Sequence, residues 1–350
     1  MGGSILGERV LRKEDPKFLT TGGKYVDDLL DEPKLAGALH VTYARSTVAH
    51  GKILSIDTSE AASMPGVVAV FTAADLGLQP VPSSFNPMAT RTLLASDKVR
   101  YVGEPIAAIV STTREQGEDA AETVYADYDV LPAYTDVMSA MAPGATLIYD
   151  ACGSNVVFDT TVLGLPENTG DAFFSDCEVV ARGMFTNQRV APCPLEVRGS
   201  AVAWVDGRLH QWISTQHAQG ALAPIAGANG VDPSQVRILT PDVGGGFGAK
   251  IGAYPEEVLL GVISSKVGKP LRWRETRIGK RAVHDAADVA DMLARGQLRH
   301  DPAPGVMQFH LRCHDARPHT PRPGRVAGLR SEEHTSELQS RIHLVCRLLL

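Results

Sequence analysis

The sequence predicts an α+β fold, and three observations support this prediction. Short runs of alternating or continuous apolar residues, typical of strands, recur between amphipathic helical stretches. Of the 350 residues, 44% are hydrophobic and 21% are charged, which is ordinary for a globular protein. No run approaches the roughly 18 consecutive apolar residues that a membrane span requires. We therefore expect a globular protein of about two domains without a membrane span.

The first region alternates short strands and short helices. Residues 52–57, 58–64 and 67–72 follow a strand, helix and strand pattern, which predicts a compact β-α-β unit. Residues 79–97 form a polar loop that contains proline, and residues 137–154 are rich in Ala, Pro and Gly, which is typical of a linker. A buried strand, an amphipathic helix and a further strand are predicted at 105–110, 114–125 and 128–131.

The second region begins with alternating strands and then leads to a glycine-rich loop. The elements predicted here are strands at 156–162, 179–185, 201–205 and 209–214, a helix at 219–229, a strand at 236–239 and a helix at 256–267. The segment Asp242-Val243-Gly244-Gly245-Gly246-Phe247-Gly248-Ala249-Lys250 follows the strand at 236–239. Because glycine adopts positive φ and has no Cβ, such a loop can bring bare N–H groups against an anionic ligand.

One interpretation of this loop is a dinucleotide site. Gly244-x-Gly246-x-x-Ala249 matches the Rossmann fingerprint, and Glu275 is placed to bind a ribose, so an NAD-dependent dehydrogenase is one alternative. Two features argue against it. A Rossmann helix begins within the glycines, whereas Pro255 indicates that the next helix begins later. Asp242 also places a carboxylate beside the expected phosphate, unless its side chain faces away.

Composition and isolated residues exclude several other classes of protein. A net charge of −6 argues against a general nucleic-acid surface. The five cysteines form no Cys-x-x-Cys pair, so neither a disulfide framework nor a metal site is predicted, and His40 and His50 are too far apart in the sequence to read as metal ligands. The first residues lack the order of a secretory signal, and we therefore expect a cytoplasmic protein.

The glycine loop resembles the corresponding motif of a known family. Asp242 to Lys250 is similar to the glycine motif of the molybdenum-binding large subunits of the xanthine dehydrogenase, aldehyde oxidase and carbon monoxide dehydrogenase family. Further segments similar to this family, in the same order, are 7–16, 25–29, 101–105, 187–189, 195–196 and 214–216. The resemblance runs from Gly7 to Arg277. It implies an α/β hammerhead domain at 1–136, a linker at 137–154 and the first part of a molybdopterin-binding α+β domain at 155–277.

The resemblance also implies chemistry, cofactors and partners. The family hydroxylates aldehydes or N-heterocycles, or oxidises CO, at a molybdenum-molybdopterin centre, for which the cytosine dinucleotide form is expected here. Electrons would leave through iron-sulfur clusters and FAD on partner subunits, in a dimer of heterotrimers. Residues that match the cofactor-binding positions are Gln216, Gly245, Gly246, Phe247 and Gly248. No catalytic residue is assigned, because the family's glutamate base lies beyond the matching region, and no residue is assigned as a metal ligand.

Several residues near these positions have alternative interpretations. Gln216 could instead cap the helix that follows it, and His217 is expected to be a surface or helix-cap residue rather than a ligand. Glu196 and Arg198 could form a structural ion pair near the site or hold substrate, and we expect the structural role. Ile251 stands where purine and aldehyde enzymes of the family often carry a glutamate, which favours the carbon monoxide dehydrogenase-like branch.

The end of the chain differs in character. Residues 330–350 match the translation of a common short-read sequencing adapter, and residues 278–329 have the Arg, His, Pro and Ala bias of GC-rich DNA read out of frame. We therefore expect family sequence only as far as Arg277, which would make the chain a truncated and inactive fragment. A non-catalytic binding module is the remaining alternative.

Overall fold

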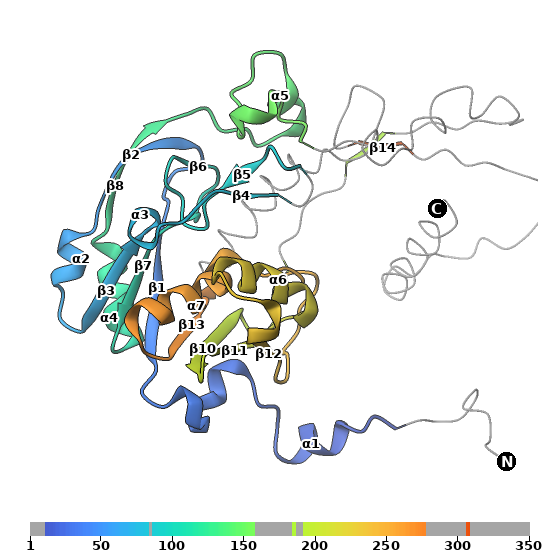
Figure 1. Ribbon diagram of the computed structural model, residues 1–350. Coiled ribbons are helices and arrows are strands. Elements are labelled where there is room, and N and C mark those ends of the chain that lie inside the picture. The colour runs from blue at the N-terminus through green and yellow to red at the C-terminus, as the bar shows by residue number, and fades with distance from the viewer. Residues whose placement is uncertain (1–10, 84–85, 158–183, 187–191, 278–305, 309–350) are drawn as a thin grey trace, which may run out of the picture. The chain divides into compact units, whose positions relative to one another are not determined.

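A seven-stranded mixed sheet organises the part of the chain that the structure describes (Figure 1). This computed structural model describes residues 11–83, 86–157, 184–186, 192–277 and 306–308. In spatial order the sheet consists of β12 (Val236–Leu239), β11 (Arg208–Ile213), β10 (Gly199–Val205), β13 (Leu271–Arg274), β1 (Leu39–Arg45), β7 (Pro105–Ser111) and β3 (Val67–Thr72). Helices and strands are mixed throughout, which confirms the α+β prediction.

The two predicted regions meet within this sheet. Strand β1 pairs in parallel with β13, with Leu39 opposite Leu271, so residues far apart in the sequence are neighbours in one ladder. The hydroxyl of buried Tyr43 donates to the backbone oxygen of Glu256 at 2.8 Å and adds a side-chain link. The β1–β13 pairing therefore fixes the first region against the second.

A second sheet contains β6 (Lys98–Val99), β2 (Gly51–Asp57) and β8 (Tyr125–Val130), in that order. The strands and helix predicted at 52–72 are present, but β2 and β3 belong to different sheets, so the predicted β-α-β unit is wrong. A parallel crossover needs about a dozen residues or more, and α2 (Ser59–Ser63) is only 5 residues long. Strand β2 pairs instead with β8, which is antiparallel to it.

Helices cover both faces of the large sheet. Helices α6 (Ala218–Ala228) and α7 (Pro255–Val267) pack on one face through an apolar cluster that includes Val202, Leu209 and Leu259. The 3-10 helices η1 (Val26–Asp31) and η2 (Pro33–Leu35) contribute to a separate cluster that contains Ala201 and Ala203. Because neighbouring residues of a strand point to opposite faces, Val202 and Ala201 place these two layers on opposite sides of β10.

A further helix of the first region covers the sheet beside β1. Helix α4 (Arg114–Glu122) begins with a capping box between Thr113 and Gln116, a sequence signal for a helix start. It ends before the predicted residue 125, because β8 begins there. Together with α2 it packs on a third apolar cluster that contains Ala61, Ala107, Ile109 and Ala120.

Short elements fill the connections. The predicted loop at 79–97 contains the two-stranded pair β4 (Val81–Pro82) and β5 (Thr90–Arg91). The segment predicted as a linker contains α5 (Val137–Met141) and η3 (Asp150–Cys152), and buried Asn155 donates to the backbone oxygen of Ala140 in α5 at 2.9 Å. The other elements are α1 (Asp15–Thr20), α3 (Ala73–Leu76), η7 (Pro233–Gln235), and a pair formed by β9 (Met184–Thr186) and β14 (Val306–Gln308).

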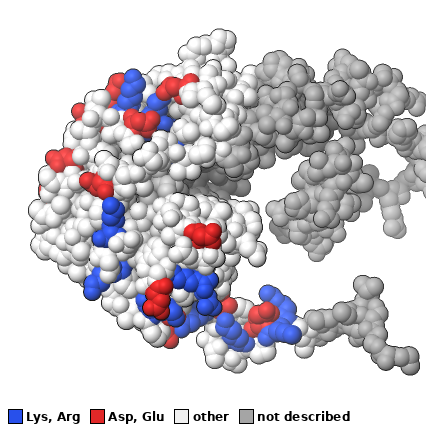
Figure 2. Space-filling model, in the orientation of Figure 1, with Lys and Arg blue, Asp and Glu red and all other residues white. Residues whose placement is uncertain are grey.

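Several predicted segments lie partly or wholly outside the described residues. They are the strand at 156–162, most of the strand at 179–185, the motif at 187–189, nearly all of 278–329, and 330–350. None of the helices that the structure describes is long and apolar enough to cross a membrane. On the face shown in Figure 2, basic and acidic side chains are interspersed, with no extended area of one sign.

Candidate functional site

The glycine loop connects the edge strand β12 to helix α7. Its backbone carries two glycines with positive φ, Gly245 at 92° and Gly248 at 87°, and between them Phe247 at 51°. A positive φ is unusual for a residue with a bulky side chain and costs about 1 kcal/mol or more. The Phe247 side chain is 75% exposed, so burial of its ring within the described part of the chain does not compensate for this strain. Strain of this kind is concentrated at ligand-binding positions.

The dinucleotide interpretation of the loop is wrong. Helix α7 begins at Pro255, well after the glycines, so its N-terminal N–H groups cannot meet a ligand bound there. The strand that follows, β13, is separated from β12 by two other strands, whereas a Rossmann unit places them side by side. Glu275, the expected ribose ligand, is buried and bonded to Arg198 instead.

Asp242 does not direct its carboxylate toward the glycines. Its Oδ2 atom accepts a hydrogen bond from the backbone N–H of Lys24 at 2.8 Å and forms an ion pair with Lys17. The backbone N–H of Asp242 donates to the Lys24 oxygen at 3.1 Å. These contacts lower the pKa of Asp242, first through its bond to Lys17. The carboxylate is thus committed to the N-terminal segment and leaves the loop free for an anion.

Glu196 connects the two ends of the loop. Its Oε2 atom accepts from the N–H of Gly244 at 2.7 Å and from the Nζ of Lys250 at 2.8 Å. Ser214 donates its hydroxyl to the same atom at 2.7 Å and accepts from Lys250 Nζ at 2.9 Å. The Lys250 side chain is fully buried, and that of Glu196 is 15% exposed. The first and last residues of the segment 244–250 are therefore held on one carboxylate oxygen.

Gln216 binds the middle of the loop. Its Oε1 atom accepts from the N–H groups of Gly248 at 3.1 Å and Lys250 at 3.3 Å. With the oxygen held in this way, the Nε2 group is directed elsewhere and makes no hydrogen bond within the described part of the chain. The structure therefore brings this residue to the glycine loop, and the alternative that it caps the following helix is wrong, because the N-cap of α6 is His217.

His217 occupies the position expected for a helix-cap residue. It is the N-cap of α6, is exposed, and its side chain makes no capping hydrogen bond. Its backbone N–H donates to Thr215 Oγ1 at 3.0 Å. A Cβ on Gly220 would lie 2.4 Å from the Nδ1 atom of His217, so the ring packs against the first turn of its own helix.

The glycines of the loop serve two different purposes. A Cβ on Gly246 would lie 2.3 Å from the amide of Gln216, and one on Gly244 would lie 2.6 Å from Cβ of Glu196. These two positions require glycine because side chains of the protein itself already occupy the space that a Cβ would need. A Cβ added to Gly248 would have no described heavy atom within 4 Å, so a ligand can approach that side of the backbone closely.

Three successive backbone donors remain available in the loop. Among the residues that the structure describes, the N–H groups of Gly245, Gly246 and Phe247 have no hydrogen-bond acceptor. Consecutive N–H groups in a turn with positive φ form a cradle for anions. Together with the Nε2 group of Gln216, they fit a ligand rich in acceptors, such as a pterin with a phosphate tail.

Arg198 lies at the centre of a separate, buried junction. Its guanidinium donates to Glu275 at 2.6 Å through one terminal nitrogen and at 3.1 Å through Nε, and the other terminal nitrogen lies 3.6 Å from Glu256. The rings of Tyr254 and Trp273 flank it, with centroids at 4.0 and 5.4 Å from Cζ. Arg198 has the structural role that we expected, but its partner is not Glu196, which pairs with Lys250. Local sequence patterns do not indicate these partners, because Glu256 and Glu275 lie far from Arg198 in the chain.

The junction separates the pKa values of two adjacent glutamates. Burial raises the pKa of Glu257 to about 8. Burial also acts to raise the pKa of Glu256, but Arg198 and Arg45 outweigh it and bring that pKa down to about 2. Arg45 lies 2.7 Å from Glu256 and reaches it from strand β1. The junction thus joins the two regions of the chain electrostatically.

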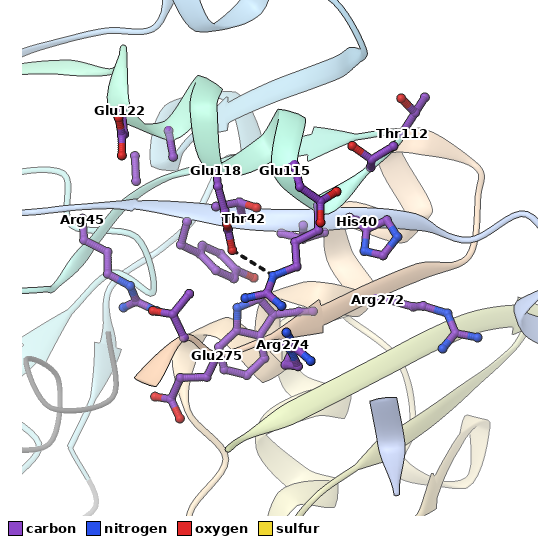
Figure 3. A pocket seen from close by; sticks show the side chains of 18 of the residues that line it. His40, Thr42, Arg45, Thr112, Glu115, Glu118, Glu122, Arg272, Arg274 and Glu275 are labelled. Atoms are coloured by element: carbon purple, nitrogen blue, oxygen red, sulfur yellow. Dashed lines mark hydrogen bonds and ion pairs between the residues drawn. The ribbon is translucent and has the colours of Figure 1, made fainter. Parts of the chain in front are cut away.

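A pocket of about 570 Å³ lies between α4 and the sheet, lined from β1 and β13 (Figure 3). No residue of the glycine loop lines it. Its four arginines are already engaged: Arg114 with Glu118 at 2.8 Å, Arg45 with Glu256, Arg274 with Asp27, and Arg272 with the backbone oxygen of Leu29. Three of these arginines are paired with carboxylates and the fourth is held by a backbone oxygen, so the pocket has less positive charge to offer an anion than its arginine count indicates.

Comparison with known proteins agrees with this geometry. Residues 20–132 match the family model of the aldehyde oxidase and xanthine dehydrogenase a/b hammerhead domain, and residues 148–287 match that of the molybdopterin cofactor-binding domain. The chain is 34% identical over 292 residues to the nicotine 6-hydroxylase large subunit of Paenarthrobacter nicotinovorans, covering 78% of this chain and 34% of that protein. It is 37% identical over 291 residues to the carbon monoxide dehydrogenase large chain of Afipia carboxidovorans, covering 78% and 35%.

Solved structures are similar over the same share of the chain. The Cu,Mo-CO dehydrogenase structure is 33% identical with a TM-score of 0.66, over 78% of this chain and 36% of that one. Quinoline 2-oxidoreductase from Pseudomonas putida 86 is 32% identical with a TM-score of 0.64, over 77% and 34%. The chain belongs to the xanthine dehydrogenase, aldehyde oxidase and carbon monoxide dehydrogenase family, of which it matches the N-terminal part. It spans about a third of the length of the curated relatives it matches.

Proposed function

We propose that this chain is the cofactor-binding part of a molybdenum hydroxylase large subunit, with the glycine loop as its cofactor contact. The observation that carries the proposal is the run of three unpaired N–H groups at Gly245, Gly246 and Phe247. When bound, the molybdenum-molybdopterin group supplies a redox-active metal for the two-electron oxidation of substrate. The residue matches to the molybdopterin-binding family model point to the same ligand.

Several residues in and beside the loop would together hold the molybdenum-molybdopterin group. The N–H groups of Gly245, Gly246 and Phe247 donate to its acceptor atoms, and the open space at Gly248 admits it close to the backbone. The Gln216 amide, held through its oxygen, presents Nε2 as a further donor. Asp242 faces away, so no carboxylate of the loop repels an anionic tail.

The form of the cofactor and the partner subunits are proposed from the family. The cytosine dinucleotide form is proposed, with iron-sulfur clusters and FAD on partner subunits in a cytoplasmic dimer of heterotrimers. In support, relatives are named as a large subunit, a large chain and subunit gamma of a dehydrogenase complex. Sedimentation and metal analysis of the chain co-purified with the products of neighbouring genes would test this arrangement.

The substrate proposed is a small molecule: CO, an N-heterocycle or an aldehyde. Relatives are named for carbon monoxide, nicotine and aldehyde chemistry. Next to the loop, Ile251 is 53% exposed and offers an apolar surface rather than a carboxylate. This residue favours uncharged substrates and, among the three, a carbon monoxide dehydrogenase-like enzyme.

Cofactor content tests the proposed function directly. The chain would be purified from cells that synthesise molybdopterin, and molybdenum and pterin would be measured per polypeptide. We expect Gly246→Ala to lower both at least tenfold, because its Cβ would displace the Gln216 amide. Gly252→Ala is the matched control, since that glycine has ordinary φ and no described heavy atom within 4 Å of the added Cβ.

Two results would contradict the proposal. One is that the parent chain, without substitutions, carries neither molybdenum nor pterin. The other is a Gly246→Ala variant that retains both at the parent level, which would mean that the loop does not contact the group. In either case a binding module without the cofactor would be favoured.

A further inference from the structure

We propose that Glu196, Ser214 and Lys250 are positioning residues that form a charge-neutral clamp and set the shape of the glycine loop for its ligand. The inference rests on the proposed function and extends it to residues that do not contact the cofactor. The three side chains meet within 2.7 to 2.9 Å of one another. Among the described residues, no other ion pair involves a residue of the loop from Gly244 to Lys250.

The clamp acts on both ends of the loop at once. At the first end, Gly244 donates its N–H to Glu196 Oε2 at 2.7 Å, and the Gly244 oxygen accepts from the Glu196 N–H at 3.1 Å. At the second end, the Lys250 side chain bonds to the same carboxylate oxygen. The Lys250 backbone oxygen also accepts from the Gln216 N–H at 2.8 Å and from the Thr215 hydroxyl at 3.0 Å.

With both ends fixed, the residues between them have little freedom. They must complete the turn with Gly245, Phe247 and Gly248 at positive φ, and the donors of residues 245–247 are left without described acceptors. The clamp therefore pre-organises the donors, which lowers the entropy cost of binding.

The charge of the clamp matters as much as its geometry. The Lys250 ammonium has no exposure and would be costly to bury without a partner. Equally, the Glu196 carboxylate without Lys250 would place an unbalanced negative charge beneath a loop that receives an anionic group. A neutral pair satisfies both conditions.

Two variants distinguish the effect of the clamp on cofactor binding from its effect on the stability of the fold. Lys250→Met leaves Glu196 unbalanced, and we expect at least a tenfold loss of bound molybdopterin. Glu196→Gln combined with Lys250→Met removes both charges, so we expect its melting temperature to recover toward the parent value. Its cofactor content should stay at least threefold below the parent, because the Lys250 end is still unclamped. Lys266→Met, an exposed lysine in the last turn of α7, is the control.

Amide hydrogen exchange measures how firmly the clamp holds the Gly244 amide when the cofactor is absent. In the chain free of pterin, we expect the Gly244 amide to exchange at least tenfold faster in both Lys250 variants, with β10 amides unchanged. Unchanged Gly244 exchange would overturn the clamp. If the double variant kept the full cofactor content, the clamp would not position the loop for its ligand, and the ion pair of Glu196 and Lys250 would contribute only to folding. Parent chain without pterin would instead refute the proposed function, and exchange alone would then decide whether the clamp exists.

Discussion

Two sites that involve neighbouring residues of one short segment differ in burial and in the kind of polar group that they hold. Glu196 holds the glycine loop, and Arg198, two residues later, holds the buried junction with Glu275 and Glu256. At the junction the guanidinium is fully buried, paired with carboxylates and flanked by two rings. At the loop, three N–H groups lack acceptors among the described residues, and Phe247 is exposed at positive φ.

This difference separates a structural site from a binding site. Buried charges require partners, and at the junction the Arg198 guanidinium is paired with Glu275 and Glu256, although one of its terminal nitrogens makes no hydrogen bond. The loop holds strain and unpaired donors, which a ligand can relieve. We therefore expect substitutions at the junction to reduce stability, and substitutions at residues 245–248 of the loop, away from the buried Lys250 ion pair, to change binding with little effect on stability.

The largest effect is expected from Arg198→Met. Removing the guanidinium leaves Glu275 and Glu256 buried without their shared cation, which should cost about 3–5 kcal/mol of unfolding free energy. Such a loss is a large share of the roughly 5–15 kcal/mol that stabilises a domain. Urea denaturation of the purified chain measures it.

Arg208→Met on strand β11 is the control for Arg198→Met, because Arg208 is exposed and should change stability by less than about 0.5 kcal/mol. If Arg198→Met cost less than about 1 kcal/mol, the junction would not be the stabilising site, and the contrast with the loop would be lost.

Local patterns predicted much of the fold. The strands at 105–110, 201–205 and 209–214 and the helix at 256–267 were found within one or two residues, because apolar periodicity and Pro255 as a helix start are local signals. The glycine loop was recognisable for a similar reason: its composition is extreme. Its proposed ligand rested on family resemblance rather than on spacing, and spacing alone also allowed the incorrect Rossmann interpretation.

Pairing over long distances could not be predicted. Nothing local indicates that β2 and β3 enter different sheets, or that β1 pairs with β13. Likewise, no local pattern indicates that Lys250 is buried, yet it is 1% exposed, with Glu196 and Ser214 bonded to it from distant segments. Ion-pair partners depend on this tertiary arrangement, which single-sequence patterns do not contain.

A second prediction concerns the pH dependence of the junction. Since the pKa of Glu257 is about 8 in the fold and 4.5 in its ordinary state, the folded chain holds a proton that the unfolded chain has lost between those values. The contribution of Glu257 to the free energy of unfolding is fully present below pH 4.5. It is lost as the pH rises toward 8, by at most about 1.4 kcal/mol per pH unit.

Substituting Glu257→Gln should remove this slope. Melting temperatures at pH 5, 6, 7 and 8 would fall in the parent and stay flatter in the variant. Glu256 contributes with the opposite sign and only in acid, because its pKa is about 2 and its stabilisation is lost below pH 4.5. Glu122→Gln at the end of α4 is a control that should keep the parent slope. Equal slopes in parent and Glu257→Gln would show that Glu257 is ionised in the fold.

The smallest effect is expected at Phe247 and concerns the strain in the loop. Its φ of 51° costs any residue with a Cβ about 1 kcal/mol, whereas glycine adopts that angle freely. We therefore expect Phe247→Gly to be about 1 kcal/mol more stable than Phe247→Ala, although glycine normally destabilises a chain relative to alanine. Urea denaturation of both variants measures the difference, and the same pair of substitutions at Val68, an exposed residue of β3 without positive φ, should give the opposite sign. If Phe247→Ala were the more stable of the two, the loop would not be strained at this residue, and its contrast with the junction would rest on the unpaired N–H groups alone.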